Sequence, residues 1–519
     1  MSTIRVDNIS STDGEFSTSV KDIFNKSSSI PSENIKLETT FERNLSDWKS
    51  EVISVKDFGA KGDGLTDDTS AFQAAFNKLS SGGYFELKIP AGRYKLSDRI
   101  SLKNTAASKV SLLGAGSEST VLDWDSTNAG LYFLSDDSGD WWFDVDGTTP
   151  LSLHFSGLSL VNRRPITNTG VEVQMNGVTG RPTMGVTFND VVWRGYNTFE
   201  TGWAKCCKLT DTPNVKFSQC RWFQGGPTST PNSSIGVEIN GTEGGDPSEF
   251  YFDQCEGFYG AVWIEAGSHV EGIRLTNCTH IGSRSIVWQA VAESGLIVVG
   301  GHFNDSVANI YLDGIFDVTV NGANFYNEGH GANSHANIAI INGGRYAITG
   351  CVFDSSTDVS ATGTTIGVIV TSSAGGEAYG GLLDCNTFHN YTDCGIVFGG
   401  GSSYNTAGAG NIFRNCNNNV ADTNATVANF IKKSLHAASA VFTFTNGGTS
   451  QAFTVNLPNG LLKTKPDVVH VNTYDFGYLA AYDFNASTAN ALVFNVRNTS
   501  ASAIPAGTTL RVGLSVPCL

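Results

Sequence analysis

The sequence predicts an all-β protein whose main body is a parallel β-helix, a solenoid of stacked coils. Three observations lead to this prediction. A short strand-like segment recurs between residues 186 and 419, charged residues make up only 16% of the chain, and glycine occurs 58 times in 519 residues. Alternating strands that recur at a near-constant period indicate stacked coils. Low charge and abundant glycine fit strands and turns better than helical bundles.

The recurring segment has two apolar residues one apart, then two polar residues and a small residue that we call the anchor. Clear copies read Val-Lys-Phe-Ser-Gln-Cys from Val215 and Ile-Arg-Leu-Thr-Asn-Cys from Ile273. Anchor spacing runs from 22 residues (Gly301 to Ala323) to 35 residues (Cys220 to Cys255). The shortest steps match one coil, and the longer steps are the same coil with inserted loops. The anchors are Val191, Cys220, Cys255, Cys278, Gly301, Ala323, Cys351, Cys385 and Cys416.

Six of the ten cysteines are anchors. A free cysteine behaves as a small buried hydrophobic residue, so we expect these side chains to stack inside the solenoid. The repeat sets their positions, which favours free thiols over disulfides. Reduced thiols indicate assembly in a cytoplasm.

The chain before the repeat has two parts. Residues 1–50 are polar and rich in serine, and are interpreted either as an attachment segment or as a flexible leader. A helix is then predicted from Thr69, with Asp67 or Asp68 as its cap and one apolar stripe. This helix would cover the open end of the solenoid, which otherwise exposes its core and a strand edge. The stripe is Phe72, Ala75, Phe76 and Leu79.

After Asn419 the repeat stops. Short alternating strands are predicted at 441–445, 452–457, 467–472, 491–496 and 509–514. The predicted domains are therefore residues 1–50, a β-helix over 51–425, and a small β-sandwich over 426–519.

Three motifs resemble the N-terminal coils of the pectate-lyase-like right-handed β-helix superfamily. They are Asp-Phe-Gly-Ala-Lys-Gly-Asp-Gly-Leu-Thr-Asp-Asp-Thr from Asp57, Ile-Pro-Ala-Gly-Arg-Tyr from Ile89, and Leu-Gly-Ala-Gly from Leu113. The resemblance implies a right-handed coil with an N-terminal capping helix. These residues are structural in the superfamily, so the resemblance is specific for the fold and not for a reaction. The glycine runs lack the Gly-Lys-Ser/Thr ending of a nucleotide-binding P-loop.

The order of attachment segment, β-helix and C-terminal β-domain resembles bacteriophage tailspikes, and the opening Met-Ser-Thr-Ile-Arg-Val-Asp-Asn-Ile is similar to tail-protein N-termini. The resemblance implies a homotrimer on the virion, made in the host cytoplasm and acting at the bacterial surface. It implies a depolymerase that binds and cuts capsule, O-antigen or exopolysaccharide. The N-terminus would bind a phage tail, baseplate or adaptor protein. The C-terminal domain would assist trimerisation or carbohydrate binding.

Charge and composition restrict the partners. A formal charge of −16 disfavours nucleic acid, and a polyanionic substrate would need a local basic patch. No apolar run is long enough for membrane insertion. No His or Cys spacing resembles a zinc site, so we predict no metal and no cofactor. Residues 136–146 place acids around Trp141 and Trp142, interpreted as an aromatic anchor for a long loop, with a cation loop or a sugar-stacking arm as alternatives.

A second strand of each coil supplies the candidate site. Aligning residues 236–240, 261–265, 285–289, 309–313 and 337–341 places Val262 and Ile264 inward. One outward column then holds Glu238, Trp263, Val287, Tyr311 and Ala339, and the other holds Asn240, Glu265, Gln289, Asp313 and Ile341.

These columns predict a glycosidase site. Glu238, Glu265 and Asp313 are the candidate acid and base, since sugar hydrolysis uses paired carboxylates. Trp263, Tyr311 and Gln289 are the candidate substrate-binding residues. The alignment puts Glu238 about 7–8 Å from Glu265, which favours an inverting enzyme. The alternative is that these are solvated residues of an outer sheet.

Other functions remain open. A lyase would need a base and a group that stabilises an enolate, for which His269, His280, Arg284 and His302 on neighbouring coils are candidates. A receptor-binding tail fibre without catalysis would have the same fold. A cellular pectin-degrading enzyme is disfavoured because the first residues do not resemble a signal peptide.

Overall fold

The structure is a computed structural model of the whole chain, and it divides into two compact units, 1–312 and 313–519. It describes residues 52–423 except for 81–85, 105–108, 136–151, 176–184, 198–199, 225–233, 328–334, 356–364 and 373–377. Outside 52–423 it describes only the short strands β1–β4 and β40–β46. The predicted tryptophan-rich loop at 136–146 lies outside the described residues. The predicted attachment segment contributes two hairpins, β1 (Asn8–Ser10) with β2 (Ser17–Ser19) and β3 (Lys36–Leu37) with β4 (Arg43–Asn44).

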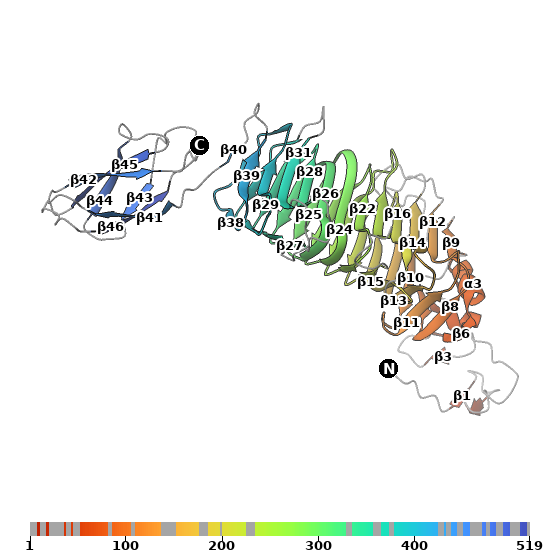
Figure 1. Cartoon of the computed structure of the whole chain (residues 1–519). Helices are drawn as coiled ribbons and strands as arrows, with labels where there is room; N and C mark the ends of the chain where they lie inside the picture. Colours follow the sequence, from red (N-terminus) through yellow and green to blue (C-terminus); the bar gives the residue numbers. More distant parts are fainter. Residues whose placement is uncertain are drawn as a thin grey trace. The chain divides into compact units, whose positions relative to one another are not determined.

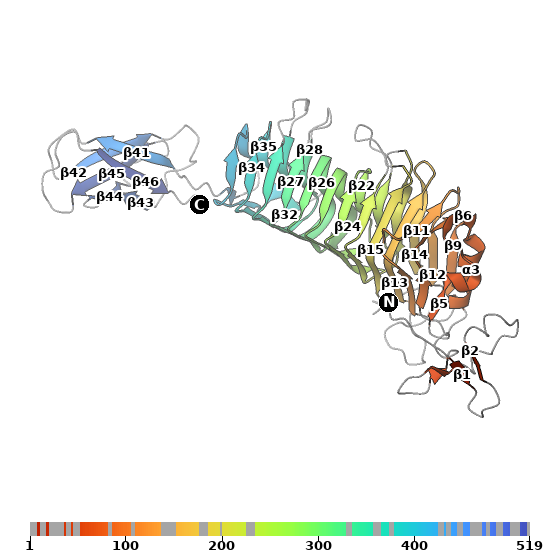
Figure 2. The ribbon, with the colours of Figure 1, turned by 90° about the horizontal axis from the view of Figure 1, so that it is seen from below.

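The first unit is built from parallel strands that lie side by side in successive coils (Figure 1, Figure 2). They form three ladders. The first ladder contains β5 (Val52–Ser54), β7 (Glu86–Ile89), β10 (Lys109–Gly114), the first halves of β13 (Ser152–Asn162) and β15 (Val186–Gly195), β17 (Val215–Ser218), β20 (Ser248–Asp253), β23 (Glu271–Thr276) and β25 (Leu296–Val299).

The second and third ladders carry the surfaces discussed below. The second ladder contains β6 (Asp63–Asp67), β8 (Gly92–Leu96), β11 (Thr120–Trp124), the second halves of β13 and β15, β18 (Arg221–Phe223), β21 (Glu256–Phe258) and the start of β24 (Thr279–Ser294). The third ladder contains β9 (Ile100–Asn104), β12 (Leu131–Ser135), β14 (Thr167–Met175), β16 (Trp203–Thr210), β19 (Ile235–Asn240), β22 (Val262–Ala266) and the later part of β24.

The boundary between the units falls within β26 (His302–Asn321). The second unit repeats the three-ladder arrangement. Its ladders are β29 (Gly344–Thr349), β33 (Leu382–Asp384), β37 (Thr406–Ala407) and β40 (Phe430–Ile431); β27 (Asn324–Asn327), β30 (Val352–Ser355), β34 (Thr387–His389) and β38 (Ile412–Arg414); and β28 (His335–Ile341), β31 (Thr365–Thr371), β35 (Cys394–Phe398) and β39 (Asn418–Asp422). The short strands β32 (Ala378–Tyr379) and β36 (Ser402–Ser403) pair beside them.

The C-terminal strands form two antiparallel three-stranded sheets. One is β41 (Ala437–Thr443), β46 (Thr509–Ser515) and β43 (His470–Thr473), and the other is β42 (Ser450–Asn456), β45 (Ala491–Asn498) and β44 (Tyr478–Asp483). All five strands predicted from the sequence are present, with shifted ends. Strand β44 is the one that the sequence analysis missed.

The core consists of equivalent side chains stacked from coil to coil. Phe155, Phe188, Phe217 and Phe252 form a column whose ring centroids lie 4.6, 4.8 and 4.8 Å apart. This is the spacing of neighbouring strands, so each coil adds one ring to the column. The apolar positions of the repeat were therefore read correctly as the interior.

A tight turn precedes each anchor. Gln219, Gln254 and Asn277 adopt positive φ angles of 53°, 51° and 51°, and the cysteines that follow them are fully buried. The Cys278 thiol donates a hydrogen bond to the Phe252 carbonyl 3.3 Å away. All the cysteines in the described part of the chain are free.

The anchor assignment fails in one coil. Cys385 itself takes the positive φ, at 57°, and is exposed. The buried position falls to Asn386, whose side chain accepts from the Cys351 amide and donates to the Ile348 carbonyl. A buried amide needs such partners, and the interior of this coil supplies them. Cys416, the last anchor, is partly exposed.

Helix α3 (Thr69–Ser80) begins where the sequence predicts and lies beside β6, β8 and β9 at the end of the first unit (Figure 1). The predicted stripe is buried throughout. Asp67 accepts from the Thr69 amide at 3.0 Å, whereas Asp68 is turned away and accepts from the Lys61 and Gly62 amides. A short 3₁₀ helix, η2 (Val55–Phe58), precedes α3. No helix of the described residues is long and apolar enough to cross a membrane.

Candidate functional site on the third ladder

A column of charged side chains follows the third ladder. Its members are direct partners in successive strands, and they point outward because their neighbours along each strand are buried. In order, the column contains Tyr132, Glu172, Lys208, Glu238 and Glu265. Val287, which is opposite Glu265 in the next strand, is buried. Acidic and basic side chains alternate from Glu172 to Glu238, and the next member, Glu265, is a second consecutive glutamate.

The observed register differs from the predicted one. Glu238 pairs with Glu265, two residues beyond the position that the sequence alignment gave it. The next pair shifts by two residues in the opposite direction, because Glu265 is opposite Val287 and not Gln289, so β22 alone is displaced from the predicted alignment. The predicted separation of about 7–8 Å is therefore wrong for the strand positions. Direct partners in neighbouring strands are about 4.8 Å apart.

Trp263 explains the error. Its side chain is fully buried, so it is not on the outer surface and cannot serve as a sugar platform. A Cβ on Gly236 would lie 2.7 Å from the Trp263 ring, and one on Gly257 would lie 2.9 Å from it. These two glycines make room for the indole inside the coil. Strand β22 consequently buries Trp263 and Ile264 in succession and leaves Val262 half-buried, which breaks the alternation assumed from sequence.

His280 is also an interior residue. Its ring stacks on the Trp263 indole with centroids 5.4 Å apart, and its Nδ1 lies 3.1 Å from the Ser285 hydroxyl. His269 lies after β22, where its Nδ1 is 3.0 Å from Asp246. His302 begins β26 and its amide donates to the Cys278 carbonyl. The structure corrects the predicted loop cluster, because His280 is buried in the core and not exposed on a loop.

Glu238 is held as an ion pair. The Lys205 ammonium contacts one carboxylate oxygen, and the Asn240 amide donates to the other at 2.8 Å. The Glu238 side chain is only 12% exposed. Each oxygen of this poorly solvated carboxylate therefore has a positively charged or hydrogen-bonding partner.

Glu265 is in a different environment. Burial raises the pKa of this carboxyl above its ordinary value, and the negative charge of Glu238 raises it further. The positive charges of Lys205 and Arg284 act in the opposite direction without cancelling the rise. Two neighbouring carboxyl groups with environments that separate their protonation behaviour are typical of acid–base pairs.

The remaining predicted residues surround this pair to different extents. Gln289 is exposed on β24, and Tyr311 is half-buried with the Arg284 guanidinium 5.9 Å from its ring centroid. Asp313 belongs to the second unit, where it accepts from the Asn342 amide at 2.8 Å. The grouping of Asp313 with the two glutamates stays a prediction.

The sequence analysis missed the first half of the column. Glu172 binds Lys208 at 3.0 Å and also contacts Arg99, whose guanidinium lies 4.3 Å from the Tyr132 ring centroid. Burial opposes ionisation of Glu172, but the hydrogen bonds and charges of Lys208 and Arg99 hold its pKa below the ordinary value. These residues precede the clear copies of the repeat, so the alignment did not reach them.

The described residues contain no group of three or more His, Cys, Asp or Glu side chains arranged to hold a metal ion.

Comparison with known proteins agrees with this architecture. Residues 52–144 match the family described as rhamnogalacturonase A/epimerase, pectate lyase-like. The chain folds as a pectate-lyase-like right-handed β-helix. Alginate lyase 7 of Azotobacter vinelandii is 40% identical over 85 residues, which are 15% of this β-helix protein and 10% of that enzyme. Mannuronan C5-epimerase AlgE2 of the same organism is 39% identical over 85 residues, 15% of this chain and 8% of the epimerase. The β-helix protein thus spans about a tenth of these curated relatives.

Solved structures with similar folds include phage tailspikes. The Dettilon tailspike protein is 13% identical, with 91% of this chain and 96% of that chain covered and a TM-score of 0.40. A tailspike protein mutant of E. coli bacteriophage HK620 in complex with pentasaccharide is 10% identical, with 96% and 99% covered and a TM-score of 0.49. At these identities the likeness concerns the fold alone.

Proposed function

We propose that this β-helix protein depolymerises a bacterial surface polysaccharide by glycoside hydrolysis, with Glu238 and Glu265 as the catalytic pair. The observation that supports this most is their direct pairing in neighbouring strands, where one carboxylate is held by Lys205 and the other has a raised pKa. A carboxyl group that keeps its proton is suited to protonate a leaving oxygen. An ion-paired carboxylate is suited to act on the anomeric carbon.

The pairing distance favours a retaining reaction. The strand spacing of about 4.8 Å is closer to the roughly 5–5.5 Å carboxyl separation of retaining enzymes than to the 6.5–9.5 Å of inverting ones. Glu265 would protonate the glycosidic oxygen while the Glu238 carboxylate bonds to the anomeric carbon. Glu265 would then remove a proton from water, which releases the sugar from Glu238. Tyr311 and Gln289 would contact the sugar on either side.

The wider setting is part of the same proposal. The domain order and the opening residues support a homotrimeric tailspike on the virion that acts at the host surface. Residues 1–50 would bind the tail or an adaptor protein, and α3 would cap the solenoid. The two C-terminal sheets would form a β-sandwich that assists trimerisation or carbohydrate binding.

One observation favours a second reaction, elimination beside a uronate. Arg284 lies near Tyr311 and is close enough to Glu265 to lower its pKa. An arginine can neutralise a uronate carboxylate, and a tyrosine can exchange the proton on the neighbouring carbon. Two relatives are named as an alginate lyase and a mannuronan C5-epimerase, although each matches only 85 residues of this chain.

Mass spectrometry of fragments released from purified host polysaccharide tests the reaction. Fragments that have gained one water, and that disappear with Glu265→Gln, are expected. Fragments with an unsaturated uronate would replace hydrolysis by elimination. Polysaccharide of unchanged size would mean a receptor-binding fibre without catalysis. Glu200→Gln, which removes an exposed glutamate in the turn before β16, is the matched control and should leave cleavage intact.

A further inference from the structure

Arginines gather on the second ladder, away from the glutamate pair. The arginine cluster consists of Arg93 on β8, Arg163 after β13, Arg194 on β15 and Arg221 on β18. The side chains of Arg93, Arg163 and Arg221 are 35%, 30% and 33% exposed. A chain with a net charge of −16 thus presents several guanidinium groups on one face.

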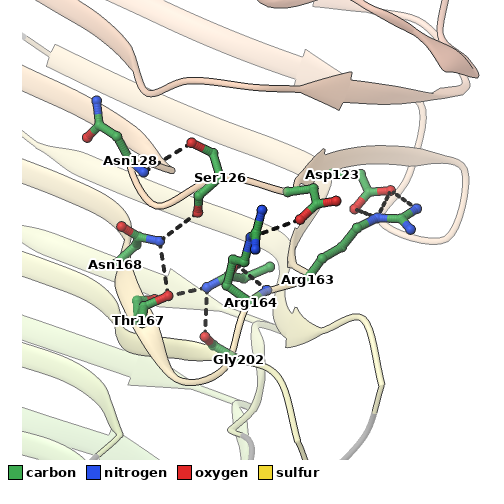
Figure 3. Close-up of polar contacts among 10 residues, drawn as sticks. Asp123, Ser126, Asn128, Arg163, Arg164, Thr167, Asn168 and Gly202 are labelled. Atoms are coloured by element: carbon green, nitrogen blue, oxygen red, sulfur yellow. Dashed lines mark hydrogen bonds and ion pairs between the residues drawn. The ribbon is translucent and has the colours of Figure 1, made fainter.

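One buried carboxylate organises the cluster. Asp123 has a side chain that is 1% exposed and accepts hydrogen bonds at 2.6 Å from both Arg93 and Arg163. Figure 3 shows the Arg163 side chain directed at Asp123. Glu118 and Asp190 lie 3.4 and 3.9 Å from Arg221. The four guanidinium groups of the cluster therefore face three carboxylates, which leaves an excess of one positive charge.

An exposed ring orders two of these arginines. Tyr196 is 50% exposed, and the guanidinium carbons of Arg163 and Arg93 lie 3.9 and 5.2 Å from its ring centroid. A guanidinium group over an aromatic face is attracted by the ring, which limits the positions that the long side chain samples. The cluster is therefore partly arranged before any ligand arrives.

The turn that carries Arg163 is fixed by a buried asparagine. The Asn162 amide donates to the Thr167 and Gly202 carbonyls at 2.9 and 2.7 Å, and its oxygen accepts from the Arg164 amide at 3.0 Å. Gly202 in turn donates to the Arg164 carbonyl. Arg164, the neighbour of Arg163, forms its own ion pair with Asp125 at 2.9 Å.

Arg194 is the least compensated member. None of the ion pairs within 4.0 Å among the described residues includes it. Burial lowers its pKa, the positive charge of Arg93 lowers it further, and Glu118 and Asp123 oppose this only in part. A bound anion would remove this repulsion.

Apolar surface continues the same column. Arg194 is directly opposite Phe223, which is directly opposite Phe258 in the next coil. Both rings are half-buried and stack face to face with centroids 5.0 Å apart, so they present their edges to solvent. The C–H groups of a sugar can contact these edges, whereas an isolated inorganic anion would gain nothing from them.

We propose that the arginine cluster and the Phe223–Phe258 pair bind an anionic sugar residue of a polysaccharide, at a site separate from the glutamate pair. The carboxylate or sulfate group accepts paired hydrogen bonds from Arg194 and Arg221, because a planar guanidinium matches a two-oxygen acceptor. The sugar ring lies along the two phenylalanines. That the ligand is a polysaccharide rests on the proposed function. The second-ladder site would hold a long chain while another part of it reaches the third ladder.

Calorimetric titration of the full chain tests this site. Glu265→Gln serves as the background so that the probe is not cut, and the probes are oligogalacturonate, a sulfated heparin fragment and neutral dextran. Arg194→Gln is compared with Arg164→Gln, which removes a neighbouring arginine that is already paired with Asp125. We expect Arg194→Gln to weaken binding of the anionic probes about tenfold, the loss of one charge-assisted hydrogen bond, and Arg164→Gln to change it little.

The comparison of probes assigns the anion. Stronger binding of oligogalacturonate supports a uronate, and stronger binding of the heparin fragment supports a sulfated sugar. Binding of either should weaken as salt is added. If Arg194→Gln does not fold, binding by Arg194→Lys, which keeps the charge, and by Arg221→Gln is compared with binding by Arg164→Gln.

Three results would overturn the proposal. They are equal binding by Arg194→Gln and Arg164→Gln, equal affinity for dextran, and a changed oligomeric state in Arg194→Gln, which would make this face a contact between copies of the chain. The catalytic proposal would fail in a different measurement, the cleavage assay, if Glu265→Gln still cleaved the polysaccharide fully. The two proposals can therefore fail separately.

Discussion

Glu238 and Glu265 are direct partners in neighbouring strands of the third ladder, and only Glu238 forms an ion pair with Lys205. The two carboxyl groups are chemically identical in the unfolded chain. In the folded protein their environments differ. Glu238 has a cation and an amide donor as partners, whereas Glu265 is half-buried beside a negative charge. This asymmetry generates the predictions for the pair.

Replacing Glu265 should stabilise the protein more at neutral than at acidic pH. The raised pKa means that the folded protein holds the Glu265 proton more tightly than the unfolded chain does. The stability from this group is complete below the ordinary carboxyl pKa and is lost as pH rises through the raised value. Glu265→Gln has no proton to lose at this position. The Tm of the variant minus the Tm of the wild type should therefore increase from about pH 4 to about pH 7. Thermal melting across this range measures the difference.

Glu256→Gln is the control for the loss of one negative charge. It removes an exposed glutamate on β21, away from Lys205 and Glu238. A Tm difference for Glu265→Gln that is the same at every pH, or that follows Glu256→Gln, would contradict the role assigned to the neighbouring carboxylate.

Removing Lys205 should shift the pH profile of cleavage upward. Lys205 contacts Glu238 and lowers the pKa of Glu265. With Lys205→Met, Glu265 therefore keeps its proton to higher pH. The alkaline limb of the kcat/KM profile, where Glu265 loses its proton, should move to higher pH. The measurement is kcat/KM for the host polysaccharide as a function of pH.

Lys216→Met is the matched variant. Lys216 is exposed on β17 of the first ladder, away from both glutamates. It should leave the position of the profile almost unchanged. Equal shifts in the two variants would mean that net charge, and not the contact with Glu238, sets the profile.

Trp263→Ala should destabilise the fold. The buried indole stacks on His280 and packs against Trp222 with centroids 5.7 Å apart. Truncating a buried aromatic residue typically costs about 3–5 kcal/mol. Denaturant unfolding followed by tryptophan fluorescence and circular dichroism measures this loss. Tyr404→Ala, at a side chain that is 63% exposed, is the control with a small expected effect. A normal unfolding midpoint combined with weaker glycan binding would contradict the burial of Trp263 and indicate that it is a surface residue.

Much of the fold could be predicted because a solenoid repeats its physical requirements. Phe188, Phe217 and Phe252 recur at one position because each ring stacks on the last, and that periodicity is visible in the sequence. The helix at Thr69 was predicted because its apolar stripe and acidic cap are local features.

The site was harder to predict because it depends on register, which loops of variable length obscure. Aligning Trp263 with Glu238 assumed strict alternation in β22, but Gly236 and Gly257 admit the indole to the interior. One feature of the sequence could have revealed that the indole is buried: a glycine opposite a large aromatic residue in the next coil. The arginine cluster had no such signal, since Arg93 and Arg194 are about a hundred residues apart and meet only through the ladder.

The rate at which cysteines of the folded protein react with a thiol reagent should distinguish exposed cysteines from interior ones. Burial raises the pKa of Cys351 to about 11 and raises that of Cys206 further, and it also blocks the approach of a reagent. Cys385, which left the anchor position, is exposed. In a Cys518→Ser background, a disulfide reagent at neutral pH should react quickly with Cys385 and slowly with the partly exposed Cys416, and with the rest only after denaturation. Adding Cys385→Ser should remove the fast phase, whereas Cys278→Ser should leave it unchanged. Fast labelling of Cys278 in the native protein would place that side chain outside the coil and contradict the anchor column.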